Sequence, residues 1–342
     1  MTAIELPQLA EPLKPADFRS NQEVRWCPGC GDHVVLATVQ SFFASLRIPR
    51  ENIVVISGIG CSSRFPYYVE TYGMHSIHGR APSIATGVAI NRPDLSVWVI
   101  TGDGDALSIG GNHLIHALRR NVNLKIILFN NQIYGLTKGQ YSPTSKLGTV
   151  SKSTPSGSID NPFDPISVAL GAGATFVART VDFDRKHMLE TLNAANQHNG
   201  TALVEVYQNC MMFNDDAYGA LNSAETKQDF TIRLRDGEPI LFGANNERAV
   251  VRDPETYELS IGAADGPNVV VHDAATANPA YAFGLAQLAD PDLRHTPIGV
   301  FRAVDRPTYD GRYRRQLDEA HQKGPSDVRK LLHGTDTWTV SA

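Results

Sequence analysis

Continuous apolar runs alternate with segments of helical periodicity through the middle of the chain. The runs expected to form strands are Asn52–Ser57, Leu95–Thr101, Leu124–Phe129, Ala174–Val177 and Ala202–Tyr207. The segments expected to form helices are Asp32–Leu46, Ala81–Asn91, Ile109–Asn121, Asp164–Leu170 and Phe183–His198. Strands that are apolar on both faces are typical of parallel sheets covered by helices on both sides. The alternation therefore predicts an α/β fold with a doubly wound, mainly parallel sheet.

The regions on either side of this pattern differ from it. We divide the chain into an N-terminal arm (1–25), an α/β domain (26–210) and an irregular C-terminal extension of α+β character (211–342). In the extension, short β-like runs lie between Phe230 and His272, and helices are expected over Pro279–Leu288 and Asp310–His321. Inside the domain, Asn130–Phe163 is a polar loop rich in Gly, Ser, Thr and Pro. Loops this long in compact domains are usually functional or mobile.

Composition excludes several classes of protein. Of the 342 residues, 20% are charged and 42% are hydrophobic, as in ordinary globular proteins. The formal net charge of −5 gives no strong electrostatic case for binding nucleic acid. No apolar window approaches the roughly 18 residues of a membrane span, and the first residues lack the basic start and apolar stretch of a secretory signal. We therefore expect a cytoplasmic protein.

The four cysteines, Cys27, Cys30, Cys61 and Cys210, point to a metal centre. Disulfides are rare in a reducing cytosol, and the CPGC segment places two thiols three positions apart, where they can bind one metal centre or form a redox pair. No strand precedes this pair, as a thioredoxin-like motif requires, and a zinc site normally has a second CxxC or a pair of histidines. One close pair with two distant single cysteines favours a 4Fe–4S cluster. Zinc remains an alternative, as does simple burial of Cys61 and Cys210.

A glycine-rich turn follows the strand that is expected to end at Thr101. It reads Gly102-Asp103-Gly104-Asp105, and 25 residues separate Gly104 from Asn130-Asn131, which follow the next strand. In a doubly wound sheet, ligands bind outside the carboxyl ends of the strands, so both segments lie on the binding edge. Glycine lets the backbone approach a phosphate closely, and a following helix can direct N–H groups at the anion.

The same turn offers ligands for Mg²⁺, which prefers oxygen and often binds one carboxylate together with substrate phosphates. Asp103 and the Asn131 side chain supply two oxygens, the Ile133 carbonyl is a candidate third, and a diphosphate would complete the shell. A GDG tripeptide alone is often only a turn, but its place after a strand, its spacing and the double Asn favour a diphosphate site. No GxxxxGK[ST] loop occurs, which argues against a P-loop nucleotide site.

Longer motifs narrow this interpretation. GDG–x25–NN resembles the thiamine diphosphate motif, and its flanking segments resemble the β subunits of 2-oxoacid:ferredoxin oxidoreductases, most of all those acting on 2-oxoglutarate. The matching segments are WCPGCG (26–31), GIGCSSR (58–64), HSIHGRA (75–81), GDGDALSIGGNHLIHALRRN (102–121) and NNQIYGLTKGQYSPTS (130–145). They occur in order over about residues 14–215, and TPIGVFRAVDRPTYD (296–310) matches more weakly.

The resemblance implies a role for each matched motif. It assigns one 4Fe–4S cluster to Cys27, Cys30, Cys61 and Cys210, and Mg²⁺ to Asp103, Asn131 and the carbonyl of Ile133. The residues that it places against thiamine diphosphate are Ile59, Gly60, Cys61, Ser62, His78, Gly104, Asp105, Gly135 and Leu136. The segment 26–210 is then the diphosphate-binding domain, and Cys61 would contact both cofactors.

The resemblance also implies an activity and partners. The activity is the coenzyme A-dependent oxidative decarboxylation of a 2-oxoacid, 2-oxoglutarate to succinyl-CoA and CO2 in the interpretation we favour, with electrons passing through the cluster to ferredoxin. The resemblance places the carboxylate that activates thiamine on a separate pyrimidine-binding domain, and the sequence shows one diphosphate-type α/β domain and no convincing second. We therefore expect an α (or fused γα) subunit, an (αβ)2 heterotetramer, and no catalytic residue that can be assigned in this chain.

Several cations lie in or near the matched segments. Arg64 and Lys138 are candidates to bind a second carboxylate of the substrate, although each is equally well explained as a solvated loop charge. The pairs Arg119-Arg120 and Arg314-Arg315 are candidates to dock an acidic ferredoxin, with ordinary surface charge as the simpler explanation.

Other functions remain open at this point. Pyruvate or another 2-oxoacid is an alternative substrate within the family. A non-redox thiamine decarboxylase or synthase shares the GDG and NN motifs but has no need of four metal-bound thiols. A zinc-stapled binding subunit would contain zinc in place of iron and would bind no thiamine diphosphate.

Overall fold

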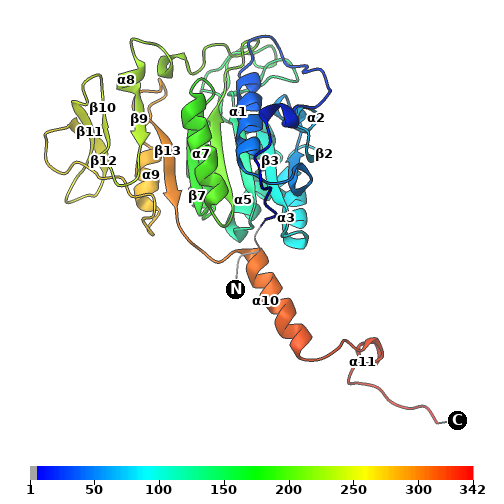
Figure 1. Cartoon of the computed structure of the whole chain (residues 1–342). Coiled ribbons are helices and arrows are strands. Elements are labelled where there is room, and N and C mark those ends of the chain that lie inside the picture. Colours follow the sequence, from blue (N-terminus) through cyan, green and yellow to red (C-terminus); the bar gives the residue numbers. More distant parts are fainter. Residues whose placement is uncertain (1–5, 342) are drawn as a thin grey trace.

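The computed structural model describes residues 6–341, and an eight-stranded sheet forms its centre (Figure 1). The strand order is β2-β1-β3-β4-β8-β7-β13-β9. These strands are β1 (Ile53–Ser57), β2 (Tyr72–His75), β3 (Ser96–Gly102), β4 (Lys125–Asn130), β7 (Phe176–Val181), β8 (Ala202–Tyr207), β9 (Thr231–Leu234) and β13 (Thr296–Ala303). Six of them run parallel, while β13 and β9 run the opposite way, so the predicted mainly parallel sheet is confirmed.

Helices cover both faces of the sheet. One face carries α1 (Asp32–Ser45) and α7 (Arg185–Gln197), and the other carries α3 (Ala81–Asn91), α5 (Gly111–Arg120), α6 (Pro165–Gly171) and α9 (Ala280–Ala286). Alternate residues of a strand point to opposite faces of the sheet. In β3 the residues on both faces are apolar, so each face can pack against helices. Its Trp98 and Ile100 pack into the core beneath α1 and α7, while Val97 and Val99 pack beneath α3 and α5.

The remaining elements are short or lie outside the main sheet. The short helices are α2 (Phe65–Tyr68), α4 (Asp103–Leu107) and α8 (Lys227–Phe230), and 3-10 turns cover Pro15–Phe18, Arg50–Asn52, Ser62–Arg64 and Gly219–Leu221. A separate antiparallel sheet contains β10 (Leu241–Phe242), β11 (Arg248–Arg252) and β12 (Leu259–Ala263). Within the polar loop, β5 (Ile133–Tyr134) and β6 (Gln140–Tyr141) form a small hairpin that the sequence pattern did not predict.

Two strands differ from the predictions for identifiable reasons. β7 begins later than the run Ala174–Val177 and continues to Val181, because the buried polar residues Arg179 and Thr180 interrupt the apolar pattern without ending the strand. β2 was not predicted, because all four of its residues are exposed at the edge of the sheet and carry no hydrophobic pattern.

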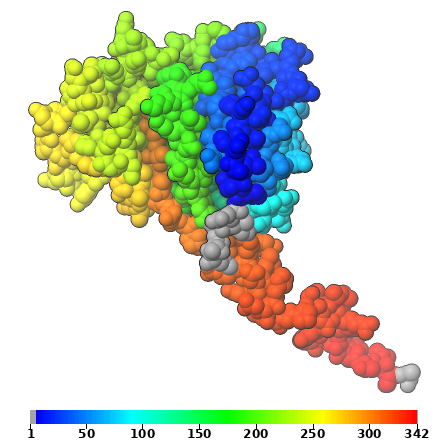
Figure 2. Space-filling model, in the orientation of Figure 1, coloured from blue at the N-terminus to red at the C-terminus, as the bar shows by residue number. Residues whose placement is uncertain are grey.

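The C-terminal extension contributes strands to the main sheet. β13 inserts between β7 and β9, and its Ile298 and Phe301 are buried. The division of the chain at residue 210 therefore stays a prediction about domains, while the sheet itself crosses that boundary. Beyond β13, α10 (Tyr309–Gln322) and α11 (Val328–His333) project away from the body as an exposed arm (Figures 1 and 2).

Between residues 6 and 341, none of the helices combines the length and the apolar character that crossing a bilayer requires.

We expect β13 to stabilise the fold and the arm to contribute little. Phe301→Ala removes a ring that is 1% exposed, and it should lower the free energy of unfolding by about 3–5 kcal/mol, because it leaves a cavity in the core. Leu331→Ala, at a residue that is 82% exposed on the arm, is the matched control and should change it by less than about 0.5 kcal/mol. Urea denaturation measures both, and equal losses would contradict this account of the extension.

Candidate functional site

The matched motifs meet at one edge of the sheet. Because β1, β3, β4 and β8 are parallel, their carboxyl ends lie side by side, and the loops that leave them are neighbours. Residues 58–62 follow β1, α4 begins at Asp103 directly after β3, Asn131 follows β4, and Cys210 lies just beyond β8. Two cavities open among these loops.

The first cavity, which we call the GDG cavity, has a volume of about 120 Å³. Its lining contains every residue predicted to contact thiamine diphosphate, namely Ile59, Gly60, Cys61, Ser62, His78, Gly104, Asp105, Gly135 and Leu136. The three predicted Mg²⁺ ligands, Asp103, Asn131 and Ile133, line the same cavity. The structure thus brings together residues from four separate loops.

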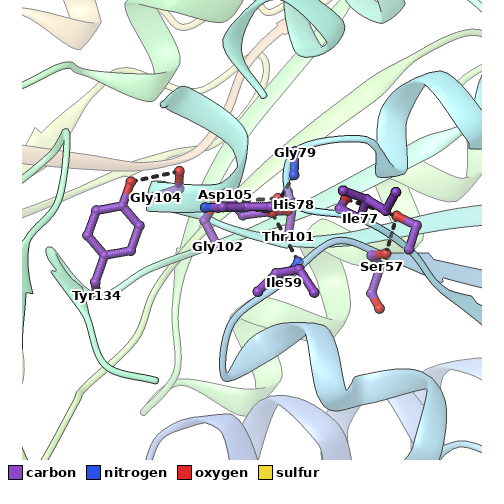
Figure 3. A network of polar contacts seen from close by, with 11 residues as sticks. Ser57, Ile59, Ile77, His78, Gly79, Thr101, Gly102, Gly104, Asp105 and Tyr134 are labelled. Carbon is purple, nitrogen blue, oxygen red and sulfur yellow. Dashed lines mark hydrogen bonds and ion pairs between the residues drawn. The ribbon is translucent and has the colours of Figure 1, made fainter. Parts of the chain in front are cut away.

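Asp105 organises the loops around the GDG cavity (Figure 3). Its Oδ1 accepts hydrogen bonds from the backbone N–H of Ile59 at 3.0 Å and of Gly79 at 2.7 Å, and its Oδ2 accepts one from the Thr101 hydroxyl at 2.7 Å. The carboxylate is buried and occupied by these donors. Asp105 therefore joins the loops after β1, β2 and β3, and its contribution to the site is to fix their positions.

His78 links this network to the cavity. Its Nδ1 lies 2.5 Å from Asp105 Oδ1, and a histidine that donates from Nδ1 to a carboxylate presents its Nε2 as the remaining polar atom (Figure 3). The side chain is 36% exposed and lines the GDG cavity. This places the imidazole where a ligand of the cavity can contact it.

Asp103 is held differently, by hydroxyl groups. Its Oδ2 accepts hydrogen bonds from the hydroxyls of Ser142 and Thr144, the latter at 2.7 Å. Burial raises the pKa of the Asp103 carboxyl above its usual range, and no basic side chain among the described residues pairs with it. Burying a carboxylate without a positive partner is costly. The Asp103 carboxylate therefore suits a bound cation such as Mg²⁺, which prefers oxygen ligands.

Asn131 has a fixed orientation. Its Nδ2 donates to Gln208 Oε1 at 2.9 Å, and its Oδ1 accepts the backbone N–H of Ile133 at 3.2 Å. The oxygen therefore faces the turn that carries the Ile133 carbonyl. Both oxygen sources lie along the cavity that contains Asp103.

The second cavity, which we call the cysteine cavity, has a volume of about 200 Å³ and is lined by all four cysteines. The CPGC loop is tied to the neighbouring loops, since Trp26 Nε1 donates to the Cys61 carbonyl at 2.7 Å and the Gly31 N–H donates to the Asn209 carbonyl at 3.1 Å. Among residues 6–341, no three His, Cys, Asp or Glu side chains are placed to hold a single metal ion. The four cysteines instead line a cavity that is larger than the site of a single metal ion.

The thiols are poor acids in this setting. Burial, followed by the charge of Asp32, raises the pKa of Cys61 to about 12, and the pKa values of Cys30 and Cys210 are also raised, with burial as the largest cause. Metal centres bind the thiolate, and a positive centre offsets the cost of ionising a buried thiol. A four-thiol set around a cavity fits an iron–sulfur cluster in its chemistry.

The two cavities share a wall formed by Cys61, Asn131, Gly135 and Leu136. Gly135 faces the cysteines, since a Cβ at this position would lie 3.5 Å from the sulfurs of both Cys61 and Cys210, an ordinary van der Waals distance. A side chain larger than hydrogen would therefore enter the space between the cysteines. Cys61 is the one cysteine among these four residues, and it lines both cavities.

The two basic residues predicted to bind the substrate lie apart from the residues predicted to contact thiamine diphosphate. Arg64 and Lys138 line the cysteine cavity and not the GDG cavity. The pairs Arg119-Arg120 and Arg314-Arg315 are at the opposite edge of the sheet, because α5 ends where β4 begins and Arg314 pairs with Asp310, which accepts the N–H of Asn123.

Four residues that help to orient the predicted ligands were not predicted from the sequence. Ser142 and Thr144 lie in the matched SPTS segment, and buried Glu205 and Arg179 interrupt apolar strands. A charged residue inside an otherwise apolar run was the available signal for the last two.

Comparisons with known proteins identify the family of the chain. The family model described as "Thiamine pyrophosphate enzyme, C-terminal TPP binding domain" matches residues 58–206. The 2-oxoglutarate oxidoreductase subunit KorB of Mycobacterium tuberculosis is 59% identical over 98% of this chain and 91% of that protein. The 2-oxoacid:ferredoxin oxidoreductase 1 subunit beta of Aeropyrum pernix is 40% identical over 73% of this chain and 74% of its own length.

The chain belongs to the 2-oxoacid:ferredoxin oxidoreductase β subunits. A solved structure of 2-oxoglutarate:ferredoxin oxidoreductase from Magnetococcus marinus agrees, with a TM-score of 0.76 and 34% identity over 97% of this chain and 98% of the other. That structure contains 2-oxoglutarate, coenzyme A and succinyl-CoA. The family predicted from the motifs and the thiamine-type α/β fold are confirmed, and the chain is a subunit of an enzyme.

We expect the hydrogen bonds of Asp105 to hold the loops of this β subunit in place and to stabilise its fold. Asp105→Asn should lower the free energy of unfolding by about 3 kcal/mol, because an amide N–H then faces donors that the carboxylate now satisfies. Asp265→Asn, on the exposed surface, is the control and should change it by less than about 0.5 kcal/mol. Chemical denaturation of the two variants measures the difference, and a loss at Asp105 as small as at Asp265 would refute the organising role.

Proposed function

We propose that this chain supplies the diphosphate, Mg²⁺ and iron–sulfur sites of a 2-oxoglutarate:ferredoxin oxidoreductase. The reaction is the oxidative decarboxylation of 2-oxoglutarate with coenzyme A to succinyl-CoA and CO2, with electrons passed to ferredoxin. The choice of 2-oxoglutarate rests on the names of the relatives from Mycobacterium tuberculosis and Archaeoglobus fulgidus, which are 59% and 43% identical. The reducing cytoplasm, where thiols stay free, is the compartment we infer.

The GDG cavity is proposed to hold the diphosphate end of thiamine diphosphate. Asp103, Asn131 and the Ile133 carbonyl supply oxygen to Mg²⁺, and His78 and the loop residues 59–62 contact the cofactor. Thiamine diphosphate, when bound, supplies the electron sink for decarboxylation of the 2-oxoacid. The chain's own part is to fix these groups in place before the substrate arrives, through the contacts of Asp105 and of the Ser142 and Thr144 hydroxyls.

The cysteine cavity is proposed to hold one 4Fe–4S cluster through Cys27, Cys30, Cys61 and Cys210. Such a cluster, when bound, supplies a one-electron carrier. Gln208 Nε2 lies 3.4 Å from the Cys30 sulfur, and hydrogen bonds to the sulfurs tune the potential of such clusters.

The shared wall is the observation that carries this proposal. Because Cys61, Asn131, Gly135 and Leu136 line both cavities, an electron donor in one lies beside an electron acceptor in the other. A non-redox thiamine enzyme has no use for this arrangement, and a zinc-stapled subunit has no use for the GDG cavity.

An α subunit is proposed to complete the site. The acidic residues that line the GDG cavity in the described chain are Asp103 and Asp105, and both are engaged in hydrogen bonds, so the activating carboxylate must come from outside. Exposed apolar side chains line the cysteine cavity, with Leu136, Met211, Met212 and Phe213 each at least 40% exposed. Such a patch is typical of a protein–protein interface. The assembly we propose is (αβ)2.

Ferredoxin is proposed to dock where the cluster lies nearest the surface. Cys27 is the exposed cysteine, and Arg25, Arg64 and Lys138 line the same cavity, which suits an acidic electron carrier. The pairs Arg119-Arg120 and Arg314-Arg315 lie at the opposite edge of the sheet and are not part of this surface.

Substrate preference tests the proposed reaction. In the complex reconstituted with its α subunit, kcat/KM should be at least tenfold higher for 2-oxoglutarate than for pyruvate or a branched-chain 2-oxoacid. The chain alone should turn over none of them. A preference for pyruvate would overturn the substrate, and turnover by the single chain would overturn the need for an α subunit.

Two cysteine variants test the assignment of the cavities. Cys210→Ser should lower the iron content of the anaerobically purified complex severalfold but leave thiamine diphosphate binding within about twofold, because Cys210 does not line the GDG cavity. Cys61→Ser should weaken both, because Cys61 lines both cavities. Iron and sulfide analysis with calorimetric thiamine diphosphate titration measures these effects. Zinc in place of iron, or an intact iron content in Cys210→Ser, would refute the cluster.

A further inference from the structure

Two opposite charges are buried in the middle of the sheet. Arg179 of β7 and Glu205 of β8 are register partners, are 2% and 0% exposed, and are joined by a bond of 2.6 Å from Arg179 Nε to Glu205 Oε2. Removing two charges from water is costly, and well-packed apolar residues often stabilise a core as well as such a pair does. Stability alone therefore does not explain why this pair stands between two apolar strands.

The other ends of both side chains reach the polar loop. Glu205 Oε1 accepts a hydrogen bond from Asn130 Nδ2 at 2.7 Å, and Arg179 Nη2 donates to Asp164 Oδ1 at 2.8 Å. Asn130 is the last residue of β4, and Asp164 is the N-cap of α6. One ion pair therefore holds the residue before and the residue after the loop 131–163, which carries Asn131, Ile133 and the hydroxyls that bind Asp103.

A second set of contacts continues from Asn130 to the predicted Mg²⁺ ligands. Asn130 Oδ1 accepts the backbone N–H of Gln132 at 3.2 Å and lies 2.9 Å from the Thr144 hydroxyl. That hydroxyl is also 2.7 Å from Asp103 Oδ2, so its single hydrogen is shared between two acceptor oxygens, one on Asn130 and one on Asp103. Because Glu205 takes the N–H of the Asn130 amide, the amide oxygen is directed toward this turn.

The guanidinium is enclosed by aromatic rings. Its central carbon lies 4.8 Å from the ring centre of Tyr207 and 5.5 Å from that of Phe301, and Nη1 is buried without a hydrogen-bond partner. Phe301 belongs to β13, so the C-terminal extension covers the pair from one side. The arginine has little freedom to move, which is what a fixed support for two loop ends requires.

We propose that the Arg179–Glu205 pair positions the loop 131–163, and through Asn130 and Thr144 it sets the orientation of Asp103. Both residues are positioning residues, since neither lines the GDG cavity or the cysteine cavity. The proposal rests on the proposed function for the identity of the ligand, thiamine diphosphate with Mg²⁺. It deepens that function by naming what preorganises the binding edge.

Glu205→Gln in the αβ complex is the direct test. A glutamine has one NH2 group and one oxygen, so whichever way it turns, its NH2 faces either Asn130 Nδ2 or Arg179 Nε, both donors. The Mg²⁺ concentration that half-saturates thiamine diphosphate binding should rise at least tenfold. Amide hydrogen exchange in residues 131–163 should also rise by at least tenfold.

Lys125→Met is the matched control. Lys125 is a buried lysine on β4, and its Nζ donates to Asn123 Oδ1 and to the carbonyls of His198 and Gly200, at the opposite edge of the sheet. This variant should lower the melting temperature but leave the Mg²⁺ requirement and the exchange of residues 131–163 within twofold of wild type. If the Mg²⁺ requirement rises equally in the control, the rise in Glu205→Gln reflects general destabilisation of the protein. That result would overturn the proposal.

Thr144→Val keeps the test available if Glu205→Gln does not fold. It removes only the hydroxyl that joins Asn130 to Asp103 and should raise the Mg²⁺ requirement severalfold. An unchanged requirement in the folded variants would overturn the positioning role. If the wild-type complex binds no thiamine diphosphate with Mg²⁺, the proposed function fails, whereas hydrogen exchange of residues 131–163 in Glu205→Gln still tests whether the ion pair holds the loop.

Discussion

The parallel direction of β1, β3, β4 and β8 is the constraint on which the whole site depends. Parallel strands end at one edge, so the loops that follow them share one small volume. Glycine is then required where loops approach most closely, as at Gly79, whose φ is +73° and where a Cβ would collide with the backbone of Gly110. Two cavities with a common wall are the geometric result, and the proposed transfer of electrons from one to the other follows from that adjacency.

The same edge must accommodate several buried charges, and each is handled in its own way. Asp105 is satisfied within the chain by N–H and hydroxyl donors and serves to join loops. Asp103 receives the hydroxyls of Ser142 and Thr144 but pairs with no basic side chain among the described residues, which leaves a need for a cation. Glu205 is compensated by Arg179 and sits beneath the edge, where it orients Asn130. Asp105 and Glu205 thus hold the loops in position, whereas Asp103 is left to bind a ligand.

Much of this was predictable from the sequence, for physical reasons. Apolar runs such as Leu124–Phe129 identify buried strands, and the order of strands and motifs then places Asp103 and Asn131 at one edge. The exposed strand β2 was not predictable, because it lacks a hydrophobic pattern. The insertion of β13 next to β7 depends on pairing between distant segments, which periodicity does not encode. The roles of Arg179 and Thr144 became visible only with their hydrogen-bond partners.

The central claim is that electrons released in the GDG cavity enter a cluster in the adjoining cavity. The most direct measurement is the electron paramagnetic resonance spectrum of the anaerobic αβ complex, frozen after 2-oxoglutarate is added without ferredoxin. The account predicts the signal of a reduced 4Fe–4S cluster, dependent on thiamine diphosphate and on Mg²⁺. A complex that contains four irons per chain and thiamine diphosphate, consumes 2-oxoglutarate and leaves the cluster oxidised would contradict it.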